Sequence, residues 1–187
     1  MARVAILASG RGSNAKSLID HFSQDLEIEV VVVGSNRKAA GVLDLAAEAS
    51  IEPLHFTKDQ MNSGYLLSEL QSRKVDWVLL SGFLLKIPEE IIENFQGKMM
   101  NIHPSLLPKF GGKGMYGMNV HNAVLEAQEL ESGMTIHMVT EDYDEGDVVF
   151  QASVDISDCK TADEIALKVL ALEHEYYPSV ASAVIKG

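Results

Sequence analysis

Short apolar runs alternate along the chain with segments whose apolar residues recur three and four positions apart. Continuous apolar runs are typical of strands buried on both faces, and the longer periodic segments are typical of helices. The strands predicted in the first half are 3–8, 28–33, 53–56, 76–80 and 98–102, with a turn at 34–36. The helices predicted between them are 15–22, 39–50, 63–73 and 88–95. Strands and helices therefore alternate.

Beyond residue 103 the pattern changes. Pro104 and Pro108 end the fifth strand, and four glycines within 111–117 predict a loop. The elements predicted after this loop are a helix at 120–127, paired strands at 133–139 and 148–154, and a last helix from 161 to about 177. Thr161 and Glu164 have the spacing of a capping box, which marks the start of the last helix.

This order predicts an α/β fold, with a mostly parallel twisted sheet and helices on both faces. We expect one domain over 1–187, in which residues 1–100 form a Rossmann-like half of strand–helix–strand units and residues 101–187 form a second half. Ligands bind such sheets beyond the carboxyl ends of the strands. The segments predicted at those ends are 9–14, 82–87 and 101–109.

Composition narrows the classes of function. The 27 acidic residues outnumber the 15 basic ones, and a net charge of −12 repels nucleic acid and anionic membranes. No apolar stretch approaches the roughly 20 residues of a membrane helix, and residues 1–10 have the pattern of a strand rather than a signal peptide. The single cysteine, Cys159, cannot form an internal disulfide. We therefore expect a cytoplasmic protein that acts on small molecules.

A glycine-rich turn follows the first strand. Residues 10–15, Gly-Arg-Gly-Ser-Asn-Ala, open a helix, so their backbone N–H groups suit a phosphate. The segment also fits a dinucleotide-binding pattern, but residues 34–37 hold no carboxylate for a ribose. Because Arg37 suits a 2′-phosphate, that alternative is weakened and stays open. We favour a phosphomonoester site to which Ser13 and Asn14 add side-chain donors.

The fifth strand ends in Asn-Ile-His-Pro, and alternation along the strand puts Asn101 and His103 on one face. A neutral histidine can take a proton from an attacking amine and return one to a leaving group. An amide can donate to the oxyanion that forms on an acyl carbon under attack. The pair therefore predicts acyl transfer to an amine, against the alternative that His103 only caps the end of the strand.

Five acidic residues lie within 141–147. A calcium loop is rejected, because the twelfth position counted from Asp142 is Ser153. A carboxylate that faced His103 would fix the tautomer of the ring and stabilise its charged form. The residues alone do not say which of the five acids does so.

The other histidines are interpreted as structural. His137 lies within a predicted strand, His121 and His55 are interpreted as surface or loop residues, and His21 as an exposed helix position. Neither they nor Cys159 have the spacing of metal ligands, so no metal is expected.

Six segments occur together in a diagnostic order: 9–14, 81–83, 101–108, 133–139, 144–146 and 173–178. Because of these segments, the chain resembles the phosphoribosylglycinamide formyltransferase family over nearly its whole length. That family has the formyltransferase fold. The Asn-x-His-Pro-Ser-Leu-Leu-Pro segment with a downstream Asp is specific to that fold. The early Gly-Ser-Asn and the late Glu-His-x-x-Tyr-Pro point to this family within it.

The resemblance implies an enzyme of de novo purine biosynthesis, and the choice between a monomer and a homodimer stays open. It would transfer the formyl group of 10-formyltetrahydrofolate, a cosubstrate, to the primary amine of 5-phosphoribosylglycinamide, with no metal. Asn101, His103 and Asp144 would be its catalytic residues, and His137 would support them.

The resemblance also implies the binding residues. Gly12, Ser13 and Asn14 would hold the substrate phosphate, and Glu173 its ribose hydroxyls. The residues implied for the folate pocket are Leu84, Leu85, Lys86, Ile87, Asn101, Thr140 and Asp142. The family often has an arginine in the loop after residue 83, and its absence here leaves backbone contacts to the folate.

The alternative functions are those of other enzymes with the formyltransferase fold and that of a nucleotide-binding regulatory module. A formyltetrahydrofolate deformylase would need a further amino-terminal domain, and a transfer-RNA formyltransferase a basic carboxyl-terminal domain, and we expect neither in this acidic chain. A sugar-nucleotide formyltransferase stays open, although such enzymes usually lack the Gly-x-Gly-Ser-Asn turn. A nucleotide-binding regulatory module would not require an Asn-x-His pair with a distant Asp.

Overall fold

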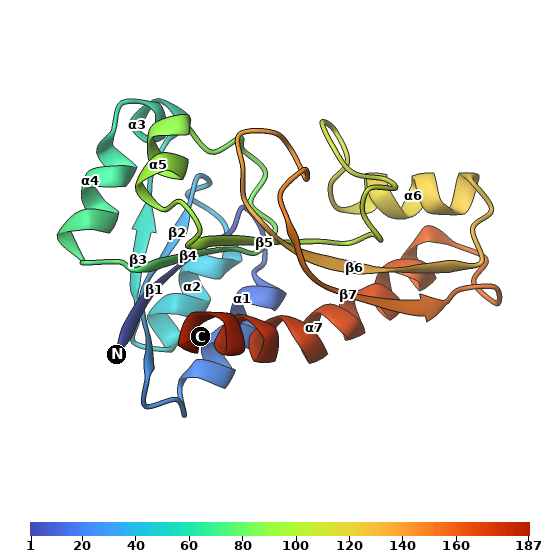
Figure 1. The fold of residues 1–187 in the computed structure, drawn as a ribbon, viewed down its shortest axis with the longest axis horizontal. Helices are drawn as coiled ribbons and strands as arrows, with labels where there is room; N and C mark the ends of the chain where they lie inside the picture. The colour runs from blue at the N-terminus through green and yellow to red at the C-terminus, as the bar shows by residue number, and fades with distance from the viewer.

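Strands and helices alternate through the first five strands of the computed structural model, which describes residues 1–187 (Figure 1). The strands are β1 (Ala2–Leu7), β2 (Ile28–Ser35), β3 (Glu52–His55), β4 (Trp77–Leu80), β5 (Met99–His103), β6 (Glu131–Met138) and β7 (Val148–Asp155). The helices are α1 (Ser13–Phe22), α2 (Gly41–Glu48), α3 (Lys58–Asn62), α4 (Tyr65–Ser72), α5 (Glu89–Asn94), α6 (Met118–Glu126) and α7 (Ala162–Lys186).

One seven-stranded sheet runs through the molecule in the order β3-β2-β1-β4-β5-β6-β7. The pairs among β1 to β5 are parallel, whereas β6 is antiparallel to both β5 and β7. The predicted α/β fold with a mostly parallel sheet is confirmed, and so is the pairing of the two late strands. The strand order reverses between β1 and β4, which is where sheets of this kind bind ligands.

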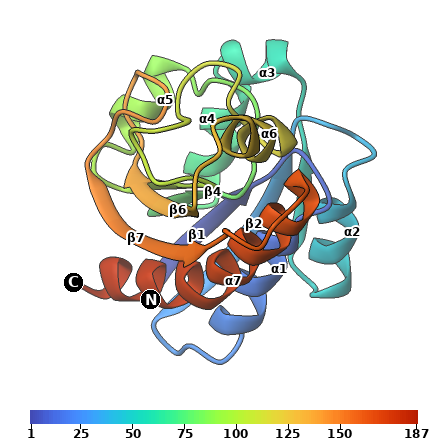
Figure 2. The same ribbon diagram turned by 90° about the vertical axis from the view of Figure 1, so that its right-hand side faces the viewer.

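Alternation along the buried strands supplies two apolar cores, one on each face of the sheet. In β1, Val4 and Ile6 belong to one core, and Ala5 and Leu7 to the other. The first core joins the sheet to α1, α2 and α7, and the second joins it to α3, α4 and α5. Figure 2 shows these two sets of helices on opposite sides of the strands. Helices therefore cover both faces, as the unbroken apolar strand runs predict.

The end of β2 and the presence of α3 differ from the sequence-based expectation. β2 continues to Ser35, so the turn predicted at 34–36 begins later. Gly34 lies between β1 and β3, and a Cβ there would come within 2.7 Å of the Leu7 side chain. This glycine therefore serves strand packing rather than a turn. The short helix α3 was not predicted, although Thr57 and Gln60 form a complete capping box at its start.

The last helix was expected to end near Tyr177, and this was wrong. α7 begins after the predicted capping box but runs through Pro178 to Lys186. A proline lacks the N–H that would bond to the carbonyl four residues earlier, here that of His174. The Ser17 hydroxyl of α1 donates to this carbonyl over 3.2 Å, and the buried Tyr177 hydroxyl donates to the Leu80 carbonyl over 3.0 Å. Tertiary contacts thus hold the helix beyond its proline.

Candidate active site

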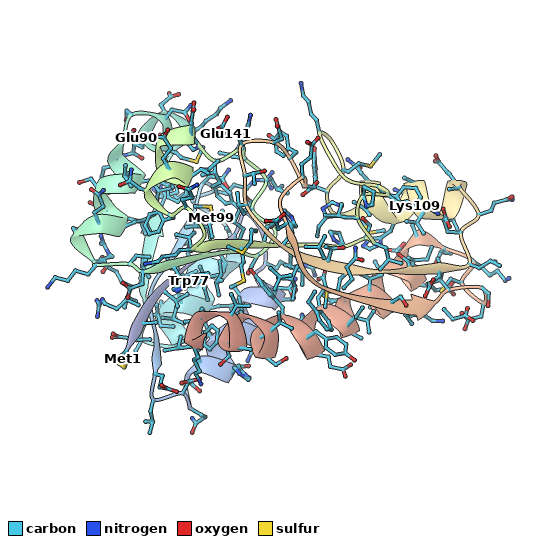
Figure 3. The ribbon with its side chains drawn as sticks, in the orientation of Figure 1. Met1, Trp77, Glu90, Met99, Lys109 and Glu141 are labelled. Atoms are coloured by element: carbon cyan, nitrogen blue, oxygen red, sulfur yellow. The ribbon has the colours of Figure 1, made fainter.

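A cavity of about 670 Å³ opens where the carboxyl ends of β1, β4 and β5 meet. Its walls include the loop between β6 and β7, which carries the labelled Glu141 in Figure 3. The predicted site residues that line it are Asn14, Leu84, Leu85, Lys86, Ile87, Asn101, His103, His137, Thr140, Asp142, Asp144 and Glu173. Residues far apart in the chain, from the carboxyl ends of β1, β4, β5 and β6 and from α7, therefore line one cavity.

Asn101 and His137 are opposite each other on neighbouring strands β5 and β6. His137 Nδ1 lies 2.9 Å from the Met138 carbonyl oxygen, which can only accept, so this nitrogen carries the hydrogen. His137 Nε2 is then free to accept the Asn101 amide, whose Nδ2 lies 3.1 Å away. The ring thereby orients the amide, and the second N–H of Asn101 is left for another acceptor.

His103, at the end of β5, is buried between two acceptors. Its Nε2 lies 2.8 Å from the Phe110 carbonyl oxygen, and its Nδ1 lies 3.5 Å from Asp144 Oδ2. Burial lowers the pKa of His103 below its ordinary value, and the negative charge of Asp144 offsets this only in part. The ring is therefore neutral at pH 7, while the facing carboxylate stabilises it whenever it takes up a proton.

Asp144 is the acid of the 141–147 loop that faces the histidines. Its Oδ2 accepts the Gly112 N–H over 2.8 Å, and its Oδ1 lies 3.5 Å from His137 Nε2. Burial alone would raise the pKa of Asp144, but His137, the charge of His103 and the Gly112 N–H together lower it. Asp144 also has a left-handed backbone, with φ 58°, which is uncommon for a residue other than glycine. The loop thus holds an ionised carboxylate beside His103.

Glu173 of α7, which also lines the cavity, contacts the start of α1. The Asn14 amide donates to Glu173 Oε2 over 2.7 Å. Glu173 is buried, and this burial raises its pKa to about 7, although the Asn14 hydrogen bond works in the opposite direction. A carboxyl group that is half ionised at neutral pH is a strong acceptor for hydroxyl groups once it loses its proton.

Gly12 and Ser13 do not line the cavity but form the adjoining start of α1. Gly12 has φ 84°, and a Cβ there would lie 2.5 Å from Val42 Cγ2. Only glycine fits this left-handed backbone directly before the first turn of α1. The positive end of a helix of this length favours an anion.

Sequence reasoning did not single out Ser9, which joins three of the loops around the site. Its buried hydroxyl donates to Asn36 Oδ1 over 2.6 Å and accepts the Leu84 N–H over 3.0 Å. These hydrogen bonds hold three segments together: the first turn, the end of β2 and the 82–87 loop. A serine directly after a buried strand was the available signal.

His121 was interpreted as a surface or loop residue, and this was wrong. It lies in α6, is 6% exposed and lines the cavity. Its neighbours Val120 and Val124 form the buried face of the helix, so helical spacing from Val124 was the signal that could have found it.

Two further observations concern the whole chain. No cluster of three or more His, Cys, Asp or Glu side chains is arranged to hold a metal ion. None of the helices combines the length and the apolar character needed to cross a membrane.

Comparisons with known proteins agree with this architecture. A family model described as formyl transferase matches residues 2–181. The chain is 39% identical to the chloroplastic phosphoribosylglycinamide formyltransferase of Arabidopsis thaliana, over 97% of this chain and 65% of that protein. It is 32% identical to the phosphoribosylglycinamide formyltransferase of Haemophilus influenzae, over 100% of this chain and 89% of that protein. The crystal structure of phosphoribosylglycinamide formyltransferase from Brucella melitensis superposes with a TM-score of 0.89 at 34% identity, over 100% of this chain and 96% of that one. The chain thus spans less than two thirds of the plant relative.

Proposed function

The chain belongs to the formyl transferase family, and from this we propose that it formylates the primary amine of 5-phosphoribosylglycinamide with 10-formyltetrahydrofolate, in de novo purine biosynthesis. The observation that carries the proposal is the cavity in which Asn101, His103 and Asp144 meet, and whose lining also includes Glu173 and the 82–87 loop. Such a cavity can hold a phosphorylated amine and a formyl donor beside one set of catalytic residues.

Asn101 is proposed to stabilise the oxyanion. The amine nitrogen forms a bond to the formyl carbon, and negative charge develops on the formyl oxygen. The second N–H of Asn101 is held ready by His137, whose Nε2 accepts the first one. A donor that is already oriented costs no reorganisation during the reaction, and losing such a donor lowers the rate by about 10²–10³.

His103 is proposed to carry the proton between the two nitrogens. The attacking nitrogen loses a proton, the nitrogen that held the formyl group gains one, and the bond between that nitrogen and the formyl carbon breaks. Asp144, 3.5 Å from His103 Nδ1, stabilises the ring while it is protonated. Because His103 has a lowered pKa, it returns the proton readily.

Residues around the catalytic centre are proposed to bind the substrates. The backbone N–H groups at Gly12, Ser13 and Asn14 suit the substrate phosphate, and Glu173 suits its ribose hydroxyls. For the folate, Leu84 and Leu85 are half-buried, Ile87 is buried, and Lys86, Thr140 and Asp142 are exposed. Apolar side chains and backbone at the wall, with polar groups at the rim, fit a flat heterocycle with a charged tail.

The proposal also covers the domain organisation, the location and the oligomeric state of the protein. Residues 1–187 are one domain with a nucleotide-fold half up to residue 100 and a catalytic and folate-binding half after it. The protein works in the cytoplasm, although the plant relatives are named chloroplastic. It acts as a monomer or homodimer.

The test is a turnover assay with purified protein, glycinamide ribonucleotide and a 10-formyl folate, following the folate absorbance. We expect turnover that requires both substrates and falls about 10²–10⁴-fold in Asp144→Asn. Asp147→Asn, an exposed acid of the same loop, is the matched control and keeps full activity. Folate consumption without the ribonucleotide would instead indicate a deformylase. The absence of folate consumption, whether the ribonucleotide is present or not, would refute the proposal.

A further inference from the structure

Arg11 is a cation of the cavity wall whose side chain has no partner within the protein. It is exposed, lines the cavity and directly precedes Gly12 and the first turn of α1. Among the arginines, only Arg3 and Arg73 use their guanidinium groups in hydrogen bonds or ion pairs. A guanidinium carries five N–H donors and no acceptor, so the donors of Arg11 are open to a ligand.

The backbone that carries Arg11 is fixed against the start of α2. The Val42 N–H donates to the Gly10 carbonyl over 3.2 Å. A Cβ at Gly41 would lie 3.6 Å from Arg11 Cα, which shows how closely the two segments approach. The root of the side chain is therefore held in place while its charged end is free. Such an arrangement lowers the ordering cost of binding.

A phosphate bound at the start of α1 has acidic neighbours. The charged residues that line the adjoining cavity are four acids and three bases: Glu141, Asp142, Asp144, Glu173, Arg11, Lys86 and Lys113. Asn14, at the proposed phosphate site, donates to Glu173 Oε2 over 2.7 Å, so the phosphate lies close to that acid. The start of a helix offers only about half an elementary charge, whereas a phosphate monoester carries about −1.5 to −2 at pH 7. A full positive charge beside the phosphate would offset this imbalance.

Of the three cations, Arg11 is placed closest to the proposed phosphate site along the chain. Lys86 lies in the loop after β4, and Lys113 lies in the loop after β5. Arg11 is two residues from Ser13, so their Cα atoms are at most about 7 Å apart. The planar guanidinium group can bind two phosphate oxygens with parallel N–H···O bonds, which the ammonium group of a lysine cannot do.

We propose that Arg11 is a substrate-binding residue whose guanidinium pairs with the phosphate of the ribonucleotide and favours the phosphorylated amine. This inference rests on the proposed function, in which only residues 12–14 hold the phosphate. The phosphate takes no part in the bond changes at the amine. The contact is therefore equally strong in the bound substrate and in the transition state, and it lowers KM without raising kcat.

The test is to measure kcat and the KM for each substrate in Arg11→Gln and Arg11→Lys. We expect Arg11→Gln to raise KM for glycinamide ribonucleotide about 10–100-fold, with kcat and KM for the folate nearly unchanged. Arg11→Lys keeps the charge but loses the planar fork, so its KM should fall between those of Arg11→Gln and the wild type. Lys16→Gln removes a cation from an exposed position of α1 outside the cavity, and as the matched control it should follow the wild type.

Calorimetric titration with the ribonucleotide, in the absence of folate, measures the same contact without any reaction. Its Kd should rise in Arg11→Gln by the same factor as KM, and inorganic phosphate should compete less well in this variant than in the wild type. An unchanged Kd would overturn the inference, as would an equal loss in Lys16→Gln or a rise confined to the KM for the folate. A wild type that binds the ribonucleotide through Arg11 but does not formylate it would refute the proposed function and leave this inference standing.

Discussion

Replacing Glu173 with glutamine should stabilise the protein at alkaline pH. Glu173 is buried in α7 with a pKa raised to about 7 from an ordinary value of 4.5. In the unfolded chain the same carboxyl group is exposed and has its ordinary pKa. Between pH 4.5 and about 7, the native protein therefore holds a proton that the unfolded chain has released. Its stability falls as the pH rises through this window.

The size of the effect follows from the shift. The difference between 4.5 and about 7 corresponds to about 3 kcal/mol, fully present below pH 4.5 and fully lost above pH 7. The glutamine side chain of the variant is neutral at every pH and can still accept the Asn14 amide through its own oxygen. We therefore expect Glu173→Gln to remove this pH-dependent loss and to exceed the wild type by up to about 3 kcal/mol at pH 8.

The measurement is urea unfolding of both proteins at intervals from pH 5 to pH 8. Glu175→Gln is the matched control, since this exposed residue lies on the same helix, and it should follow the wild type. Stability curves for Glu173→Gln and wild type that stay parallel across the range would refute the reasoning. They would mean that the native carboxyl titrates as it does in water. Weaker substrate binding by Glu173→Gln would be the accompanying cost if this carboxylate holds the ribose.

Three further substitutions test single contacts. Gly12→Ala places a Cβ 2.5 Å from Val42 Cγ2 at φ 84°, so we expect KM for the ribonucleotide to rise at least roughly tenfold, and an unchanged KM would contradict this. Tyr177→Phe removes the buried hydroxyl that donates to the Leu80 carbonyl, and it should lower the free energy of unfolding by about 1 kcal/mol in urea. Ser17→Ala removes the donor to the carbonyl that the helix proline leaves free, and should lower stability by about 1 kcal/mol; a neutral result would show that this carbonyl needs no partner.

Hydrophobic patterning was enough to predict the sheet and most of the helices. Strands such as β1 and β2 are short, continuous and apolar, and this pattern arises only where both faces are covered. The strand ends then marked 9–14, 82–87 and 101–109 as ligand loops, and the cavity draws on all three. These features are local, since each depends on residues within one or two turns of chain.

Contacts between distant segments decided the rest. Helix α7 passes Pro178 because Ser17, in another helix, bonds to the carbonyl that the proline leaves free. Helical spacing from Val124 puts His121 on the inner face of α6, but only the packing of α6 against α7 decides that this polar residue is buried.

The sequence by itself determined the fold class, the strand ends and the pairing of Asn101 with His103 on one face, because alternation along a strand is a property of neighbouring residues. Only the tertiary structure decided which of five acids faces His103 and what its Nε2 contacts. Asp144 has a left-handed backbone and faces His103, and the Phe110 carbonyl accepts a hydrogen bond from His103 Nε2. Both contacts join segments that fold against each other, and a hydrogen bond across such a gap leaves no periodic signal in the chain.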